Sequence, residues 1–235
     1  AIKLSEIDKN FFFRCSIVLV INIINIFSHF FELIYIVVLF HALKINILMK
    51  SEMKTINSNH KVAIFCGSMF GSKKEYKDLA IKVTEYLSKN DYDIVYGGGE
   101  NGLMGVVANT AIKNKAHVTG IIPEFLDNRE TIHKKIDKIF ITKTMEQRKK
   151  KFLSISDSFI ALPGGGGTIE EIGLVLSALQ LGVIKNKKFL IFNYKNYWSD
   201  IIKQYQKVVN NGFAYKSFNN LFIVCSNLKE LKKNF

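Results

Sequence analysis

The residues best suited to chemistry stand in one short segment, which reads ALPGGGGTIEEIG from Ala161 to Gly173. Glycine lets backbone N–H groups approach an anion closely, and a helix that starts at such a loop adds unpaired N–H groups and the positive end of its dipole. The carboxylates of Glu170 and Glu171 follow at once. Beside a bound phosphate, a carboxylate can stabilise positive charge on a sugar carbon or activate water. The segment therefore indicates cleavage of a phosphate-bearing glycoside.

The same residues also fit a pattern that is purely structural. Thr168 and Glu171 have the spacing of a capping box, with Thr168 as the N-cap and Glu171 as the third residue of a helix. Taken alone, this is the commoner meaning of the pattern. It places Glu171 in the first turn of the helix, so the structural and chemical interpretations are compatible.

A basic segment provides the possible partner of these carboxylates. Thr144 and Gln147 form a second capping box and put Arg148 in the first turn of another expected helix. An arginine fork binds phosphate or carboxylate through two hydrogen bonds. Arg148 and Lys149 are therefore candidates for the same site, whereas the two lysines that follow are expected to be solvated.

Two other glycine clusters also follow apolar runs. Gly67 and Ser68 come after VAIFC, and GGGENGLMG, residues 97–105, comes after DIVY. Neither is a P-loop or a clean G-x-G-x-x-G. Two polyglycine loops that each follow an apolar run and open a helix favour an anion cradle over simple tight turns. The residues expected to form it are Ser68, Gly98, Gly99, Gly165, Gly166, Gly167 and Thr168.

Short apolar runs alternate with helix-period segments from residue 61 onward. The expected strands are Val62–Cys66, Asp93–Tyr96, His117–Ile122, Lys138–Ile141, Ser158–Leu162, Phe189–Phe192 and Leu221–Val224. The expected helices are Lys73–Asn90, Leu103–Lys113, Met145–Ser156, Ile169–Leu181 and Tyr197–Asn210. Most of the apolar runs are continuous, as in a parallel sheet covered on both faces. The sequence therefore predicts an α/β fold, a Rossmann-like doubly wound parallel sheet with helices on both faces, whose ligands bind at the carboxyl ends of the strands.

Composition narrows the class of protein. The chain has 235 residues, 48% of them hydrophobic, which is enough for one sizeable α/β domain. Its three cysteines form no CxxC pair, so neither a disulfide framework nor a zinc site is expected. The formal charge of +13 comes mostly from scattered lysines, without an arginine-rich run among aromatic residues. The charge therefore suits an anionic small substrate better than nucleic acid.

The first 48 residues differ from the rest. From Phe11 to Leu48 the chain is dominated by Ile, Phe, Leu and Val, but polar residues interrupt the run. A spanning helix needs about 20 apolar residues, so this segment is borderline. Two interpretations stay open: a membrane anchor or N-terminal extension, or a translated upstream stretch before a protein that starts near Met49. Residues 49–235 are expected to form the Rossmann-like domain of a cytoplasmic protein, with membrane contact only if residues 11–48 are inserted.

Four motifs occur together in the second part of the chain. They are CGS (Cys66–Ser68), YGGGENGLMG (Tyr96–Gly105), MEQRK (Met145–Lys149) and PGGGGTIEE (Pro163–Glu171). From about Lys61 to the C-terminus the sequence resembles the Lonely-guy (LOG) family of cytokinin riboside 5′-monophosphate phosphoribohydrolases, often mislabelled as lysine decarboxylases. The resemblance implies hydrolysis of the N-glycosidic bond of AMP or an N6-modified AMP, without metal or organic cofactor. The products would be the free base and ribose 5-phosphate.

The resemblance also implies roles for single residues. Arg148 and Glu171 correspond to a catalytic pair, and Gly165–Thr168 to a phosphate cradle. Further substrate-binding roles fall on Glu130, Lys149, Glu170 and Ser177. Members of the family are usually oligomers, so a homodimer or larger homo-oligomer is expected. Departures from the family pattern at Gly166, Ala178 and Glu100-Asn101 leave the base specificity open.

Three alternatives compete with this interpretation. A PLP-dependent lysine decarboxylase needs a Schiff-base lysine with an acidic partner for the pyridine nitrogen, and no residue stands out for either role. A nucleotide- or cofactor-binding carrier would share the glycine loops but would have no evident use for Arg148 and Glu171. A Rossmann-like protein that binds single-stranded DNA would be expected to carry a cluster of stacking aromatics.

Overall fold

The protein is described by a computed structural model that covers residues 40–41, 44, 59–126 and 132–235. The chain divides into two units, Ala1–Ser58 and Asn59–Phe235, and every element discussed below belongs to the second. The predicted N-terminal extension lies almost wholly outside the described residues, and Glu130 lies outside them too. Among the residues that are described, no helix has the length and apolar character needed to cross a bilayer.

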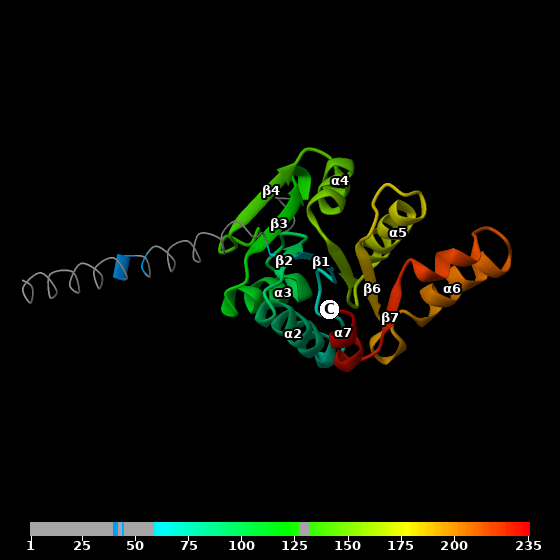
Figure 1. Cartoon of the computed structure of the whole chain (residues 1–235), viewed down its shortest axis with the longest axis horizontal. Coiled ribbons are helices and arrows are strands. Elements are labelled where there is room, and N and C mark those ends of the chain that lie inside the picture. The colour runs from blue at the N-terminus through cyan, green and yellow to red at the C-terminus, as the bar shows by residue number, and fades with distance from the viewer. Residues whose placement is uncertain (1–39, 42–43, 45–58, 127–131) are drawn as a thin grey trace, which may run out of the picture. The chain divides into compact units, whose positions relative to one another are not determined.

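Seven parallel strands form one sheet in the order β4-β3-β2-β1-β5-β6-β7 (Figure 1). Their bounds are β1 Lys61–Phe65, β2 Asp93–Tyr96, β3 Val118–Pro123, β4 Lys138–Thr142, β5 Ser158–Ala161, β6 Lys188–Phe192 and β7 Ile223–Cys225. The central strands are buried along their whole length, because helices cover both of their faces.

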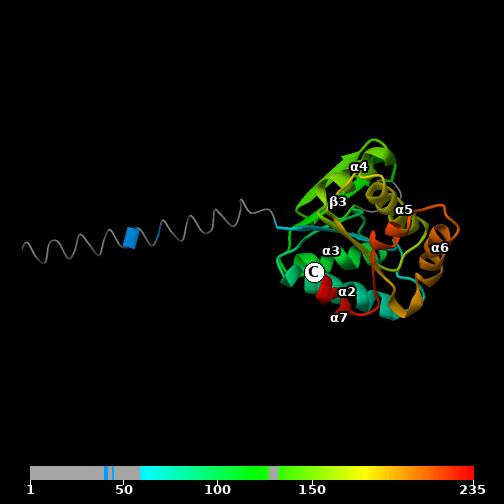
Figure 2. The same ribbon diagram turned by 45° about the vertical axis from the view of Figure 1, so that its right-hand side comes forward.

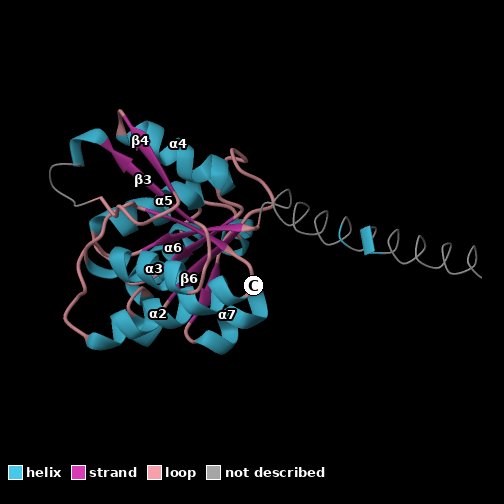
Figure 3. Cartoon of the chain, turned by 90° about the vertical axis from the view of Figure 1, so that its left-hand side faces the viewer, coloured by secondary structure: helices cyan, strands magenta, loops and turns pink. Residues whose placement is uncertain are grey.

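The helices lie in two layers, one on each face of the sheet. They are α2 Lys74–Lys89, α3 Gly102–Lys113, α4 Met145–Ile155, α5 Gly166–Gln180, α6 Ser199–Asn210 and α7 Leu228–Asn234. Residues of α2, α3 and α7 share one hydrophobic core, and residues of α4, α5 and α6 share the other. Figure 2 shows α4, α5 and α6 apart from α2, α3 and α7, and Figure 3 shows the same strands and helices from another direction. The predicted Rossmann-like fold is thus confirmed.

The chain order of the strands reverses between β1 and β5. From β1 the chain adds β2, β3 and β4 on one side, then returns through α4 to place β5 on the other side of β1. In sheets of this kind ligands bind at the carboxyl ends of the strands that flank such a reversal. The loops there are tied together, since the Gly67 N–H donates to the Pro163 carbonyl at 3.2 Å.

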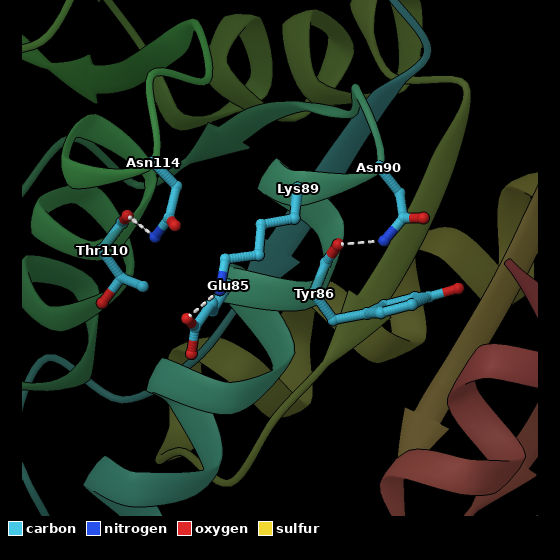
Figure 4. Close-up of polar contacts among 6 residues, drawn as sticks. All are labelled: Glu85, Tyr86, Lys89, Asn90, Thr110 and Asn114. Carbon is cyan, nitrogen blue, oxygen red and sulfur yellow. Dashed lines mark hydrogen bonds and ion pairs between the residues drawn. The ribbon is translucent and has the colours of Figure 1, made fainter.

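The neighbouring helices α2 and α3 each end at an asparagine, Asn90 and Asn114. The side-chain amide of Asn90 donates to the Tyr86 carbonyl at 2.7 Å, and that of Asn114 donates to the Thr110 carbonyl at 2.8 Å (Figure 4). The Asn90 N–H donates to the Leu87 carbonyl, so the Asn90 side chain supplies the donor that the Tyr86 carbonyl would otherwise lack. The Thr110 carbonyl accepts from the Asn114 N–H as well, at 3.2 Å. The observed C-terminal ends of α2 and α3, Lys89 and Lys113, lie within one residue of the ends predicted from the sequence.

Candidate functional site

The tetraglycine passes directly into a helix. Gly165 is the N-cap of α5, and the first hydrogen bond of this helix runs from the Ile169 N–H to the Gly165 carbonyl at 3.1 Å. The N–H groups of Gly166, Gly167 and Thr168 therefore have no acceptor within the helix. The expectation that Thr168 is the N-cap is wrong, because the helix starts at Gly166, three residues earlier than expected, and Thr168 is buried in its first turn.

The side-chain-free surface at this helix start faces open space. A Cβ atom built on Gly165, Gly166 or Gly167 would meet no atom within 4 Å, and none of the three has a left-handed φ. Neither packing nor backbone conformation therefore demands glycine at these positions. Glycine at these positions instead suits a ligand that must come close to the backbone. The N–H groups and the helix dipole favour an anion as that ligand.

These glycines border a cavity of about 300 Å³, here called the cradle cavity. Its lining residues are Cys66, Gly67, Ser68, Met104, Leu126, Met145, Arg148, Gly165, Gly166, Gly167, Thr168, Glu170 and Glu171. The structure thus brings together most of the predicted site residues, from β1, α4 and α5. Lys149 lies at its rim through an ion pair with Glu170.

A cation and a carboxylate face each other inside the cradle cavity. Arg148 Nη1 lies 3.6 Å from Glu171 Oε1, and the two side chains are only 13% and 14% exposed. Glu171 stands four residues after Gly167, so both occupy the same side of α5, about 6 Å apart along its axis. The carboxylate therefore lies one turn deeper than expected from the sequence, yet on the side that carries the free N–H groups.

The cysteine of this cavity is not suited to nucleophilic attack. Burial raises the pKa of the Cys66 thiol, and the neighbouring Glu171 carboxylate raises it further. With its pKa raised, Cys66 remains a neutral thiol at ordinary pH. Because the thiolate is the reactive form, Cys66 is then a poor nucleophile. Among the described residues that line this cavity, the ionisable groups left for chemistry are then Arg148, Glu170 and Glu171.

The second glycine cluster makes most of its contacts within the protein. Two N–H groups in the first turn of α3, those of Leu103 and Met104, donate to the Gly67 carbonyl at 3.1 and 3.3 Å, so these two are already used. Gly98 and Gly99 are buried and do not line the cradle cavity. The Gly98 carbonyl accepts from His133, and Gly99 forms a β-bridge with Ile132. Gly98 and Gly99 therefore connect β2 to the segment around His133 without bordering the cradle cavity.

One predicted binding residue lies away from the cavity. Ser177 is exposed on α5, eleven residues after Gly166, which corresponds to about 16 Å along the helix. It is not among the residues that line the cradle cavity. In contrast, Met104, Leu126 and Met145 line it but were not expected to. Met104 and Met145 belong to the motifs YGGGENGLMG and MEQRK, so the sequence offered a signal for both, whereas Leu126 lies in none of the four motifs.

A second cavity, of about 320 Å³, adjoins the first and is here called the aromatic cavity. Its lining residues are Gly67, Ser68, Met69, Phe70, Gly71, Ser72, Tyr76, Leu103, Pro163, Gly164, Gly165 and Tyr197. No charged side chain is among them. Gly67, Ser68 and Gly165 line both cavities, so the two meet at the anion-binding loops.

Two rings and one glycine shape the aromatic cavity. Tyr76 and Tyr197 pack edge to face with their centroids 5.5 Å apart, and the Tyr197 hydroxyl donates to the Gly164 carbonyl at 2.6 Å. A Cβ on Gly71, whose φ is +72°, would come within 2.9 Å of the Tyr76 ring. Glycine is therefore needed there for the loop to pass over Tyr76.

The sequence relatives of this chain reported below share one enzyme name. The family model described as "Possible lysine decarboxylase" matches residues 104–235. Cytokinin riboside 5′-monophosphate phosphoribohydrolase LOG1 of Arabidopsis thaliana is 38% identical over 174 residues, which is 74% of this chain and 81% of that protein. LOG3 of the same plant is 35% identical over 78% of this chain and 85% of its own length.

Solved structures with this fold are more distant in sequence. The molybdenum cofactor carrier protein from Chlamydomonas reinhardtii aligns with a TM-score of 0.57 at 14% identity, covering 75% of this chain and 95% of that one. The molybdenum cofactor binding protein from Rippkaea orientalis gives a TM-score of 0.57 at 18% identity, with coverages of 75% and 94%. At such identities the likeness establishes the fold alone.

Proposed function

Since the chain belongs to the family of cytokinin riboside 5′-monophosphate phosphoribohydrolases, we propose that it hydrolyses the N-glycosidic bond of adenosine 5′-monophosphate or an N6-modified derivative. The observation that carries the proposal is the pairing of Arg148 with Glu171 beside free helix N–H groups. A carrier needs the N–H groups but not the ion pair. A hydrolase of this type uses both.

The 5′-phosphate is assigned to the start of α5. The N–H groups of Gly166, Gly167 and Thr168 bind its oxygens, and the positive end of the helix dipole adds to the attraction. Ser68 lines the same cavity and supplies a hydroxyl. The phosphate thereby anchors the nucleotide while the sugar extends along α5 towards Glu171.

Glu171 is assigned the catalytic step. As the bond from C1′ to the base nitrogen breaks, its electron pair stays on the base, which takes up a proton, and positive charge develops on the sugar. The Glu171 carboxylate stabilises that charge and takes a proton from a water molecule whose oxygen bonds to C1′, giving ribose 5-phosphate. The proton taken up by the base comes from solvent, and Glu171 returns its own proton to solvent. Arg148 orients the carboxylate through their contact. These steps use only water and groups of the chain itself.

Product analysis tests the proposal. The full chain is incubated with AMP, with N6-isopentenyl-AMP and with the monophosphates of guanosine, cytidine and uridine, and released base is measured by chromatography. Free adenine or N6-substituted adenine, with one equivalent of ribose 5-phosphate, is expected. Tight binding of AMP without base release over hours would instead identify a carrier.

The base and its substituent are assigned to the aromatic cavity. The cradle cavity alone, at about 300 Å³, is at the lower limit for a ligand site. The adjoining cavity of about 320 Å³ offers uncharged and aromatic walls that suit a purine and an apolar N6 group. Because Gly67 and Gly165 line both cavities without side chains, one ligand can occupy the two together.

Replacing Tyr76 should therefore change the choice of base. In Tyr76→Ala the KM for N6-isopentenyl-AMP is expected to rise about 10-fold, since an apolar contact of this size is worth roughly 1–3 kcal/mol. The KM for AMP, which lacks the apolar group, should rise less than about 3-fold. Steady-state kinetics with the two substrates measures the ratio. Equal losses for both would place the substituent elsewhere.

Self-association is also proposed. Leu181 and Val183 follow α5, Phe213 and Tyr215 follow α6, and all four are between 69% and 86% exposed. Because α5 and α6 cover the same face and follow the parallel strands β5 and β6, both helices end at the same end of that helical layer. Exposed apolar groups of this size suit contact with a second copy. Light scattering should give at least twice the chain mass of 26.8 kDa, and a monomer would contradict the proposal.

A further inference from the structure

Arg148 is held on several sides by groups that play no direct part in the proposed reaction. Its Nε donates to the Ile121 carbonyl at 3.0 Å, which ties it to β3. Its guanidinium carbon lies 5.2 Å from the centre of the Phe152 ring, one helical turn further along α4. The Phe152 ring is 1% exposed and packs against Phe65, so it is itself fixed in the core.

Gly97 forms the remaining wall. A Cβ atom on Gly97 would lie 2.9 Å from Arg148 Nη2 and 2.7 Å from the Met104 sulfur. Its φ is not left-handed, so the backbone does not demand glycine there. Other glycines of the loop are needed for the chain path: a Cβ on Gly102 would lie 2.2 Å from the Ser68 carbonyl oxygen, and one on Gly105 would lie 1.8 Å from that of Glu100.

We propose that Gly97 and Phe152 are positioning residues, which confine the Arg148 guanidinium between a bare stretch of backbone and an aromatic ring so that Nη1 meets Glu171. This inference rests on the proposed function, because it concerns how the Arg148–Glu171 pair is kept in register. It also gives a role to the start of the second glycine cluster, which lies outside the cradle cavity. A displacement of about 1 Å in such a pair can lower a rate on the order of 100-fold.

The first test is Gly97→Ala. The atoms that a methyl group would displace are the ends of two flexible side chains, so the fold should survive and the guanidinium should move. We expect kcat for AMP hydrolysis to fall 10- to 100-fold while KM changes less than about 3-fold, because the phosphate is held by α5. Gly173→Ala is the matched control. A Cβ there would meet only the Tyr205 hydroxyl at 3.9 Å, and full activity is expected.

A double-mutant cycle separates positioning from general damage. In an Arg148→Ala background, Gly97→Ala should lower the residual rate less than 2-fold, because the guanidinium is gone and only the flexible end of the Met104 side chain is still displaced. A loss there as large as in the wild-type background would overturn the inference. Added guanidinium ion should partly restore Arg148→Ala, and this rescue should be weaker when Phe152→Leu removes the ring.

Failure of the inference can be told from failure of the proposed function. If the wild-type chain releases no base from any monophosphate, the proposed function fails, and a crystal structure of Gly97→Ala still tests the positioning. A guanidinium that keeps its contact with Glu171 in that structure would refute the role of Gly97. A guanidinium moved away from Glu171 would support it.

Discussion

Glu171→Gln should lower kcat for base release on the order of 1,000-fold. The amide has the shape of the carboxylate and preserves α5, but it cannot stabilise positive charge at C1′ or take a proton from water. At 14% exposure the Glu171 side chain is screened little by solvent, so loss of its charge acts at nearly full strength. KM for AMP should change only a few fold, because the phosphate is bound by the backbone of Gly166, Gly167 and Thr168. Chromatographic assay of base at saturating AMP measures the loss.

Glu170→Gln is the matched control for this substitution. Glu170 is the preceding residue on α5, is 48% exposed and forms an ion pair with Lys149 at the rim of the cradle cavity. Exposed pairs of this kind are worth at most about 1 kcal/mol, so kcat should fall less than 10-fold. If Glu171→Gln kept the wild-type rate, or if kcat fell more in Glu170→Gln than in Glu171→Gln, the assignment of Glu171 as the catalytic carboxylate would be wrong.

The sheet could be predicted from the sequence because its strands are marked by short apolar runs. Continuous apolar runs such as those of β1 and β5 are typical of strands with both faces covered, and each is followed by a segment of helical period. All seven strands therefore lie within a few residues of their predicted positions. Family membership followed from the motifs at the ends of these strands, and the relatives confirm it.

Helix starts were less predictable where glycine is involved. Thr144 caps α4 as expected and accepts from the Gln147 N–H at 3.1 Å. α5 instead starts at Gly166, although glycine has low helix propensity, because burial of Thr168 and packing against the sheet decide the matter. α7 was missed, although Asn227 accepts from the Glu230 N–H and supplies a recognisable capping signal.

Glycine is also ambiguous in function. Gly97 and Gly166 both follow strands and look alike in sequence, yet one makes room for Arg148 and the other exposes N–H groups to a cavity. Only the positions of neighbouring atoms distinguish these roles. The aromatic cavity was unpredictable for the same reason, since Tyr76 and Tyr197 meet across the sheet edge from α2 and from the turn before α6.

Arg148→Lys should lower kcat by about 100- to 1,000-fold, although it keeps the positive charge. The guanidinium donates to the Ile121 carbonyl, lies over the Phe152 ring and reaches Glu171 at the same time. A lysine ammonium has no planar fork and cannot make these contacts together, so the carboxylate loses its orientation. Steady-state kinetics with AMP measures the loss, and thermal unfolding by circular dichroism verifies that the fold is kept.

Lys149→Arg is the corresponding control at the next position. Lys149 is 33% exposed and its ammonium pairs with Glu170, an interaction that arginine can also make. Its kcat should stay within about 3-fold of wild type. If Arg148→Lys retained most of the rate, positive charge alone would suffice at this position. The enclosure of the guanidinium by Gly97, Ile121 and Phe152 would then have no catalytic purpose.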